Sequence, residues 1–347
     1  MASIITPVKY SIKRGLQYLS ASFGRHTRKP DQPELLLLMY HRILPADDPR
    51  ALLEEPGMMV SPETFKLHMS LIKSLFETMH LSHWLELKDS GKQLPKRACA
   101  ITFDDGWADN YEFAYPILKE LEIPATIYLV ADMIGKSATF WPERLSALIT
   151  SISQHPDKWS HESLHWITQL QTSYLFNEKN TLPPTSEQLS EIIASAKSLK
   201  DSEVHRRLDV AETQLQISYG QQHAALLSWQ QVNEMCQSGL IEAGSHTCNH
   251  IRLTKDIQQT VLSREITDSK QIIEQQTGRR VKTFCYPNGD YSSAAKTLVE
   301  QHYAGAVTTE SGWNTAASNP YLLRRIGMHE DISHDRTSFL ARISGWL

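Results

Sequence analysis

The sequence predicts an α/β fold, a distorted (β/α)7 barrel of the TIM type that is interrupted by a helical insertion. Short apolar runs of strand length alternate with segments of helical periodicity, which is typical of parallel α/β folds. About seven such runs are present, and this number favours an incomplete or distorted barrel over an open sheet. Residues 135–227 are polar and contain no convincing buried strand, so they are predicted to form the insertion.

The part before the insertion begins with Glu34–Tyr40 (ELLLLMY), a continuous apolar run that predicts a buried parallel strand. Ser61 and Pro62 predict the N-cap and first turn of a helix that extends to about Met79. The next expected elements are strand Ala98–Phe103, helix Asp109–Leu121 and strand Ala125–Val130.

After the insertion, Ser228 and Gln231 form a capping box, and Gly239 is expected just beyond the end of that helix. The further expected strands are Leu240–Gly244, Val281–Tyr286, Gly305–Thr308 and Leu323–Met328, and the further expected helices are Ile257–Gln276 and Ser292–His302. In such a barrel the carboxyl ends of the strands form the active-site face. Polar residues that directly follow a strand are therefore the candidates for function.

Composition excludes some classes of function. The chain has 347 residues and a net charge of −4, which argues against nucleic acid as a partner. Its four cysteines form no CxxC pair, so a reducing compartment, the cytoplasm, is expected. No secretory signal and no membrane-spanning run is apparent.

Residues 1–30 differ from the catalytic part expected at 31–347. They contain no acid but six basic residues, Lys9, Lys13, Arg14, Arg25, Arg28 and Lys29. Apolar residues recur in them at helical spacing, namely Ile4, Val8, Ile12, Leu16 and Leu19. The segment is interpreted as a basic amphipathic helix, either associated peripherally with the anionic inner membrane face or packed on its own domain.

Three polar clusters follow predicted strands. The first is Thr102-Phe-Asp-Asp-Gly106, in which one carboxylate can bind a metal and the other act as a base; alone, it could be a solvated Asp-Gly turn. The second, HTCNH, places His246 and His250 four residues apart, a usual spacing for two imidazoles on one metal, although a pair of surface histidines is the alternative. The third, Tyr286-Pro-Asn-Gly, forms either an ordinary turn or a loop that presents a backbone N–H to an oxyanion.

In this order, TFDDG, HTCNH and YPNG resemble the polysaccharide deacetylases with a NodB homology domain, carbohydrate esterase family 4. The resemblance implies a distorted barrel that removes acetyl groups from N-acetylated glycans. It implies that Asp104 is the catalytic base and that Asp105, His246 and His250 hold a divalent metal. It further implies that the Asn288 backbone N–H stabilises the oxyanion. Zn²⁺ is the default metal for these ligand types, with Co²⁺, Mn²⁺ or Fe²⁺ as alternatives.

The chain departs from the family pattern in several places. Cys285 stands where the family often has an arginine that pairs with the base, and Arg324 or Arg325 is a candidate replacement. The general acid is expected to be His329, oriented by Asp331, with His41 as its rival. Substrate contacts are expected from Trp313, Tyr286 and Arg325, although core packing is the alternative for Trp313.

Residues 161–165 (HESLH) fit the HExxH motif of zinc proteases, but only three positions are fixed and chance matches are common. The sequence thus favours a metal-dependent deacetylase of a cell-surface polysaccharide or its precursor. The alternatives are a related amidase that acts on a non-sugar amide, and a non-catalytic glycan-binding module.

Overall fold

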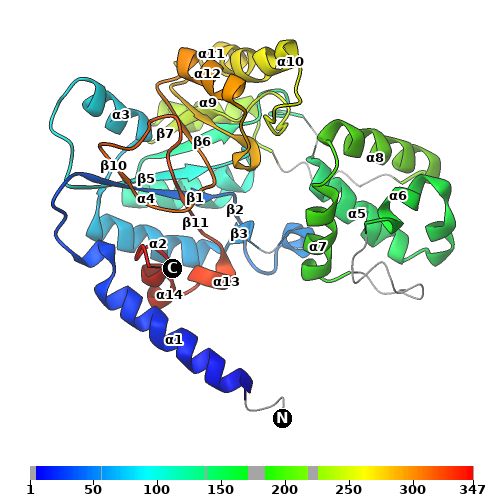
Figure 1. The fold of residues 1–347 in the computed structure, drawn as a ribbon, viewed down its shortest axis with the longest axis horizontal. Coiled ribbons are helices and arrows are strands. Elements are labelled where there is room, and N and C mark those ends of the chain that lie inside the picture. The colour runs from blue at the N-terminus through cyan, green and yellow to red at the C-terminus, as the bar shows by residue number, and fades with distance from the viewer. Residues whose placement is uncertain (1–4, 56, 137–138, 171–183, 218–225, 347) are drawn as a thin grey trace.

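The computed structural model describes residues 5–55, 57–136, 139–170, 184–217 and 226–346. A curled sheet forms the centre of the molecule, helices cover its outer side, and a separate group of helices stands beside it (Figure 1). None of the helices in the described ranges has the length and apolar character that a membrane span requires.

The sheet confirms the predicted α/β barrel. Neighbouring strands follow the order β10-β1-β5-β6-β7-β8-β9, and every pair except β1 with β10 is parallel. The strands of this path are β1 (Glu34–Tyr40), β5 (Arg97–Phe103), β6 (Ala125–Leu129), β7 (Ile241–Ser245), β8 (Thr283–Cys285), β9 (Gly305–Val307) and β10 (Asn314–Thr315). Each parallel strand lies within about two residues of its predicted bounds, because buried strands leave a strong apolar signal.

The barrel closes through the last predicted strand, which is distorted. Only Ile326–Gly327 (β11) pairs with β1, while Leu323 forms an isolated parallel bridge to β9. The segment 323–328 therefore crosses from one edge of the sheet to the other. Short accessory strands add to the sheet or pair with each other, namely β4 (Glu77–Thr78), β2 (Arg42–Ile43) and β3 (Met59–Val60).

The outer layer consists of short helices. They are α2 (Pro62–Leu75), α3 (Leu81–Asp89), α4 (Tyr115–Leu121), α9 (Trp229–Gln237), α10 (Gln259–Ser263), α11 (Ser269–Thr277), α12 (Ser293–His302), α13 (Glu330–Ser333) and α14 (Arg336–Arg342). The predicted capping box at Ser228 is present, and Gly278 ends α11 in a left-handed conformation. Two predicted helices each contain a π-helical turn, Asn110–Ala114 before α4 and Arg264–Asp268 before α11.

The insertion is helical where it is described, with α5 (Trp141–Ser153), α6 (His165–Thr168), α7 (Ser186–Ala196) and α8 (Asp201–Leu215). These helices enclose a hydrophobic cluster of their own, separate from the barrel core. In Figure 1 they stand to one side of the sheet. The insertion is therefore a small helical layer with its own core.

Helix α1 (Ile5–Phe23) packs on α14 near the other end of the chain. Ser20 and Gly24 are buried in this contact, whereas Leu16 and Leu19 are exposed. The helix thus docks on its own domain, but not through Leu16 and Leu19, while the side chains of Ile4, Val8 and Ile12, the other apolar residues at this spacing, lie outside the described part.

Candidate metal and active site

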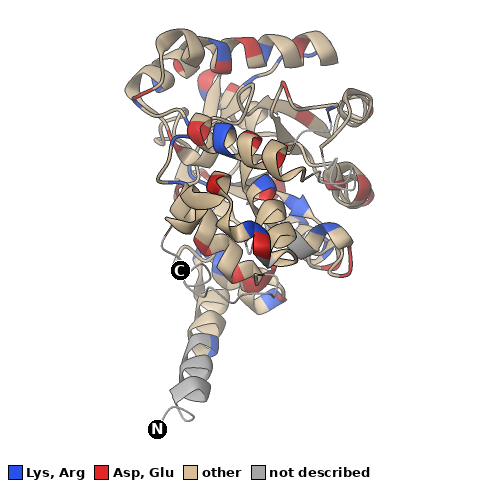
Figure 2. Cartoon of the chain, turned by 90° about the vertical axis from the view of Figure 1, so that its right-hand side faces the viewer, with Lys and Arg blue, Asp and Glu red and all other residues tan. Residues whose placement is uncertain are grey.

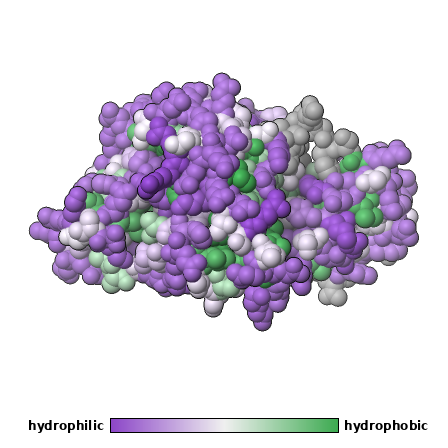
Figure 3. Space-filling view, turned by 90° about the horizontal axis from the view of Figure 1, so that it is seen from above, coloured by the Kyte–Doolittle hydropathy of each residue, from purple (hydrophilic) through white to green (hydrophobic). Residues whose placement is uncertain are grey.

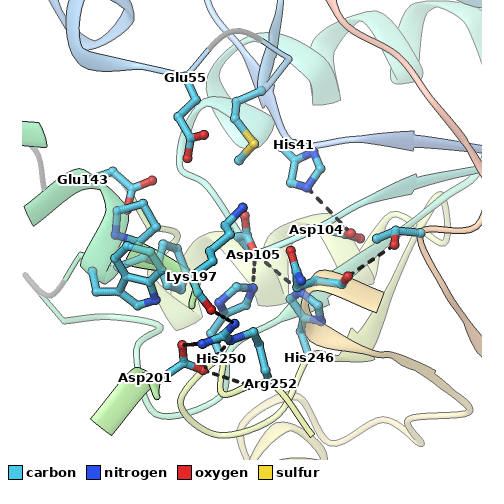
Figure 4. A pocket seen from close by; sticks show the side chains of 16 residues that line it. His41, Glu55, Asp104, Asp105, Glu143, Lys197, Asp201, His246, His250 and Arg252 are labelled. Carbon is cyan, nitrogen blue, oxygen red and sulfur yellow. Dashed lines mark hydrogen bonds and ion pairs between the residues drawn. The ribbon is translucent and has the colours of Figure 1, made fainter. Parts of the chain in front are cut away.

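The carboxyl ends of β5 and β7 bring the first two polar clusters together, as the barrel topology requires. Asp104 and Asp105 directly follow β5, and the loop with His246 and His250 directly follows β7. Figure 4 shows these four side chains around one pocket. Residues 141 or more positions apart in the sequence are thereby placed within a few ångströms of each other.

Asp105, His246 and His250 form a cluster that fits a metal ion. The Nε2 atoms of both histidines lie 3.4 Å from Asp105 Oδ1, and the three ligand atoms lie within 4.8 Å of one another. Asp105 Oδ1 is buried and has no hydrogen-bond partner in the described part of the chain, whereas Oδ2 accepts a hydrogen bond of 2.9 Å from Trp107 Nε1–H. A buried carboxylate oxygen without a donor is unfavourable unless a cation binds it.

The surroundings of the two histidines orient their Nε2 atoms toward this cluster. His246 Nδ1–H donates to the carbonyl oxygen of Cys285 at 2.8 Å, which leaves Nε2 with its lone pair free for a metal. The His250 ring packs against Phe140, with a centroid distance of 5.0 Å. An Asp-His-His set of this kind suits a divalent ion with open coordination positions, as a catalytic zinc site has.

A second set of potential ligands, Asp104, His246 and Cys285, also lies close enough to hold an ion. Its members are already engaged. Both Asp104 oxygens accept hydrogen bonds from Arg325, and burial raises the pKa of the Cys285 thiol, which disfavours the thiolate that a metal requires. The Asp105 cluster is therefore the better metal site.

The backbone of the loops that carry the predicted metal ligands and Asn288 is unusual. Asp105, Thr247, His250 and Asn288 all have positive φ, between 55° and 74°, although none is glycine. Such conformations cost on the order of 1 kcal/mol each and tend to concentrate at functional sites. The buried carboxylate of Glu265 compensates in part, because its Oε2 accepts hydrogen bonds of 2.9 Å from the backbone N–H groups of Cys248 and Asn249. Glu265 belongs to a π-helical turn, a feature that often marks functional sites.

Asp104 is held by Arg325 in a fully buried, two-pronged ion pair. The Nη1–Oδ1 and Nη2–Oδ2 distances are both 2.7 Å, and Arg325 is 0% exposed. Burial alone would raise the pKa of Asp104, but Arg325, assisted by His246 and His41, outweighs burial and lowers it. Arg325 also lies 3.2 Å from Cys285 Sγ, so it occupies the place that the sequence left open for the family's arginine.

Asp105 and His250 are shifted toward their metal-binding forms. His246 is not: burial alone would lower its pKa, but Cys285 and the two neighbouring carboxylates outweigh burial and raise it. Burial opposes the ionisation of Asp105, but the imidazoles of His246 and His250 beside it hold its pKa below its usual range. Burial lowers the pKa of His250 to about 4, with Asp105 opposing and His246 adding to the shift. An ionised carboxylate and a neutral imidazole are the forms that bind a metal.

His41 and Asn288, two further predicted residues, also line the pocket. His41 follows β1, and its Nε2 lies 3.9 Å from Asp104 Oδ2 (Figure 4). His329 follows β11, forms an ion-pair contact of 3.6 Å with Asp331, and is not among the residues that line this pocket. Of the two rival acids, only His41 therefore lies next to Asp104, the predicted base.

None of the three expected substrate contacts is among the residues that line the pocket. Tyr286 is fully buried and packs on Phe284 at a centroid distance of 5.3 Å. Trp313 is buried in the barrel core, where its Nε1–H donates to the carbonyl oxygen of Ile343. Arg325 is fully buried, is paired with Asp104 and does not line the pocket. The only sequence signal for a substrate contact was that each residue lies near the end of a strand. In the structure, each side chain is instead buried in the core or held by an ion pair.

The insertion forms one wall of the pocket, which the sequence did not reveal. Glu143 of α5 and Lys197 just after α7 face the metal cluster, and Glu55 lies across from them (Figure 4). Burial raises the pKa of Glu143 well above its usual value, and the nearby Glu54 carboxylate adds to the shift. These residues carry no motif, so only their placement identifies them.

Arg252 joins this wall to the metal-binding loop. Two residues after His250, it forms an ion pair of 2.9 Å with Asp201 at the start of α8. Its guanidinium also donates to the carbonyl oxygens of Lys197 and Leu199, at 2.7 and 2.6 Å. The insertion is thus tied to the loop that carries a predicted metal ligand.

The HESLH segment does not form a metal site. It spans a short 3-10 turn and the start of α6 instead of one continuous helix, and His161 Nδ1 is bonded to Ser163 Oγ at 2.8 Å. Neither His161 nor His165 belongs to a potential metal cluster of the described residues.

The family model for polysaccharide deacetylases matches residues 91–304, more than half of the chain. The chain belongs to the polysaccharide deacetylase family. A putative polysaccharide deacetylase, YxkH of Bacillus subtilis (strain 168), is 31% identical over 185 residues, which cover 53% of this chain and 57% of that protein. A poly-β-1,6-N-acetyl-D-glucosamine N-deacetylase of Staphylococcus epidermidis is 30% identical over 132 residues, 35% of this chain and 45% of that protein. The matches thus span only about half the length of these relatives.

Solved deacetylases share the fold. The Streptococcus pyogenes deacetylase PplD, in complex with acetate, aligns with a TM-score of 0.57 at 20% identity and covers 90% of this chain and 99% of its own. IcaB from Ammonifex degensii aligns with a TM-score of 0.57 at 15% identity, over 91% of this chain and all of its own. The family match and these alignments together confirm the resemblance that the three motifs suggested.

Proposed function

We propose that the chain is a metal-dependent deacetylase that hydrolyses the acetamide groups of an N-acetylated polysaccharide or of its precursor, and releases acetate. One observation carries the proposal: Asp104, locked by Arg325, lies directly beside the Asp105-His246-His250 cluster in a single pocket. A base next to a Lewis-acid site is the arrangement that hydrolysis of an unactivated amide requires.

A divalent ion held by Asp105, His246 and His250 would supply Lewis-acid chemistry, which lowers the pKa of water and polarises the acetyl carbonyl. The chain's own groups then move the protons. Asp104 accepts the proton of the attacking water, and Arg325 keeps that carboxylate ionised and oriented.

Two further residues that line the pocket complete the proposed chemistry. The backbone N–H of Asn288 stabilises the negative charge that develops on the acetyl oxygen. His41 protonates the leaving nitrogen, a role that its position 3.9 Å from Asp104 supports. His329 is the weaker candidate for this acid because it lies outside the lining of the pocket.

We propose a polymer of N-acetylglucosamine as the substrate class, with the β-1,6-linked form first, because two relatives of the chain carry that activity in their names. The test is acetate release from a panel of β-1,6- and β-1,4-linked N-acetylglucosamine oligomers and lipid-linked sugars, with metal-loaded wild type beside Asp104→Ala. We expect release by the wild type and loss of at least about 10²-fold in the variant. Absence of release from every glycan, with bound metal verified, would reject the proposal.

We also propose that the enzyme works in the cytoplasm, at the inner membrane face. All four cysteines are buried and unpaired, which suits a reducing compartment. Fractionation of cells that express the full chain tests this location: the protein is expected with the cytosolic and inner-membrane markers, and recovery in the culture medium would contradict it.

A further inference from the structure

Helix α1 carries an apolar surface that no part of the described chain covers. Leu16, Leu19 and Phe23 recur at helical spacing and are 53%, 50% and 59% exposed, and Tyr18 beside them is 66% exposed. We call these four residues the α1 stripe. Helices on globular proteins normally bury such a stripe against the core. Here the large apolar side chains point outward.

The opposite face of the helix explains this orientation. Ser20 and Gly24 are buried, and a Cβ atom added to Gly24 would lie 2.5 Å from Ser344 Cβ. The backbone N–H of Arg25 donates to the Ser344 carbonyl oxygen at 2.7 Å. Small residues thus allow the end of α1 to approach the end of the chain closely. Because this contact uses the small face, the stripe is left free for something else.

The apolar exposure is concentrated in one part of the molecule. The described residues include seven exposed large hydrophobic side chains, of which four form the α1 stripe and one is Trp346, while Val210 and Val261 lie elsewhere. The surface seen from above is mainly hydrophilic with small apolar patches (Figure 3). Clustered exposed apolar side chains mark an interaction site, whereas scattered single ones do not.

The charges around the stripe are mainly positive. Residues 1–30 hold six cations and no acid. Two of the cations, Arg14 and Arg25, form ion pairs of 2.6 Å with Asp335 and Glu34, and exposed Asp31 follows Lys29. Figure 2 shows α1 projecting from the body without an acidic residue in its described part. Arg28 and Lys29, just beyond the helix, are exposed, and the Arg28 guanidinium lies over the Trp346 ring, 5.6 Å from its centroid. Trp346 is itself 51% exposed, and tryptophan and arginine side chains are common at membrane interfaces.

We propose that the α1 stripe, with Trp346 and the cations at 28 and 29, is a docking surface for an anionic lipid bilayer. The helix lies in the plane of the interface, with its apolar side chains at the boundary between headgroups and acyl chains. Charge decides between this partner and a second copy of the chain. Two copies joined stripe to stripe would bring together two surfaces on which cations outnumber acids, whereas an anionic leaflet supplies the opposite charge.

This surface deepens the membrane location proposed above and rests on it, but it does not involve the catalytic pocket. The test is co-sedimentation of the full chain with vesicles of phosphatidylglycerol and phosphatidylcholine, compared with vesicles of phosphatidylcholine alone. We expect binding to the anionic vesicles that weakens with salt. The triple variant Leu16→Gln, Leu19→Gln, Phe23→Gln should bind at least about tenfold more weakly. It removes most of the apolar area that the bilayer would bury.

The matched control is Val210→Gln with Val261→Gln, which removes exposed apolar side chains elsewhere and should bind like the wild type. Unchanged thermal unfolding of the triple variant verifies that it folds.

Equal binding of the triple variant and the wild type, or equal binding to both vesicle types, would overturn the proposal. A wild-type dimer that the triple variant dissociates would assign the stripe to a second copy instead. Acetate release from soluble oligomers should be the same in all variants, so a failure of this surface is distinguishable from a failure of the proposed deacetylase.

Discussion

The barrel and the insertion contribute to the same pocket in different ways. On the barrel side, Asp104 is paired through both oxygens and the His246 ring is fixed by a backbone carbonyl. On the insertion side, Lys197 is exposed, and Glu143 Oε2 is buried without a hydrogen-bond partner in the described residues. The side chains from the barrel are therefore fixed in position by hydrogen bonds within the protein. The side chains from the insertion have polar atoms that can still form hydrogen bonds to a ligand.

This difference separates chemistry from substrate choice. In the proposed reaction, preorganised groups at the strand ends act on the acetamide. The insertion has its own core and touches the metal loop mainly through Arg252 and Phe140, so its wall can vary without moving the metal cluster. If the distinction is correct, substitutions should affect turnover strongly in the barrel, moderately at the junction, and not at all deep in the insertion.

The largest effect is expected for His250→Ala. The variant should lose bound divalent metal and at least about 10³-fold in acetate release, because a catalytic metal supplies several kcal/mol of transition-state stabilisation. Metal content measured by elemental analysis, together with acetate release, checks this expectation. His302→Ala, at an exposed histidine of the barrel, is the control and should retain both. Full metal content in His250→Ala would place the metal elsewhere.

Arg325→Met should have the next largest effect, because it leaves Asp104 buried and unpaired. Losing one partner of such a pair costs about 3–5 kcal/mol of stability. The folded-state pKa of Asp104 is lowered, so the pair stabilises the fold at neutral pH and this contribution is lost as pH falls through that pKa. In the variant the pKa of Asp104 rises, so the acid limb of the pH–rate profile should move to higher pH.

Chemical unfolding and pH–rate profiles of Arg325→Met and Arg325→Lys measure these effects. The lysine variant keeps the charge but not the two-pronged geometry, so it should fall between the wild type and the methionine variant. Arg324→Met changes the exposed neighbouring arginine and should leave both measurements unchanged. An acid limb that does not move in Arg325→Met would mean that Asp104 is not the base.

Asp104 and Arg325 also show what the sequence could and could not predict. Buried strands and the TFDDG and HTCNH motifs are local patterns, so they predicted the barrel and the cluster of Asp104, Asp105, His246 and His250. The partner of Asp104 is separated from it by 221 residues, and the sequence offered Arg324 and Arg325 equally. Which of the two arginines reaches Asp104 depends on the direction of each side chain beside a short, distorted strand. The spacing of residues in the sequence does not determine that direction.

The same limit applies to the expected substrate contacts that do not line the pocket. Trp313 and Tyr286 lie close to strand ends in sequence, but both turn into the core, where aromatic rings bury more area than at a rim. The α1 stripe is the reverse case, because an amphipathic pattern predicts an apolar face without showing whether the domain covers it. Long-range packing settles these choices.

His68 should make the barrel sensitive to acid. It is fully buried under α14, where Nε2–H donates to the Ser333 carbonyl at 2.7 Å and Nδ1 accepts from Tyr40 O–H at 3.0 Å. Burial lowers its pKa to about 4, so the unfolded chain binds more protons than the folded chain between pH 4 and the usual value of 6.5. Stability should therefore fall as pH falls through this window, by up to about 3 kcal/mol.

The free energy of unfolding between pH 7 and pH 4, measured for wild type and His68→Gln, tests this expectation. In the glutamine variant, the part of the pH dependence of the unfolding free energy that comes from His68 should be largely absent. His83→Gln, at a histidine that is more than half exposed, should keep the wild-type slope. Identical slopes in wild type and His68→Gln would show that His68 is not the acid-sensitive group.

Arg252→Gln tests the junction between the two regions. It removes the ion pair with Asp201 and the bonds to the carbonyl oxygens of Lys197 and Leu199, so the wall should shift relative to the metal loop. We expect KM to rise by about tenfold and kcat to change less, because substrate placement is affected more than the chemistry. Asp201→Asn, alone and combined with Arg252→Gln, should give a non-additive cycle. Arg264→Gln, at an exposed pair, is the control and should behave like the wild type.

The smallest effect is expected for His161→Ala combined with His165→Ala, which removes both histidines of the HESLH segment. They lie within the insertion, outside every potential metal cluster of the described residues, and His165 is exposed. Metal content and acetate release should remain at the wild-type level, and stability should change by less than about 1 kcal/mol, mainly through the lost contact of His161 with Ser163. Loss of metal in this variant, beside full retention in His250→Ala, would move the metal centre from the barrel to the insertion and reverse the division of roles between them.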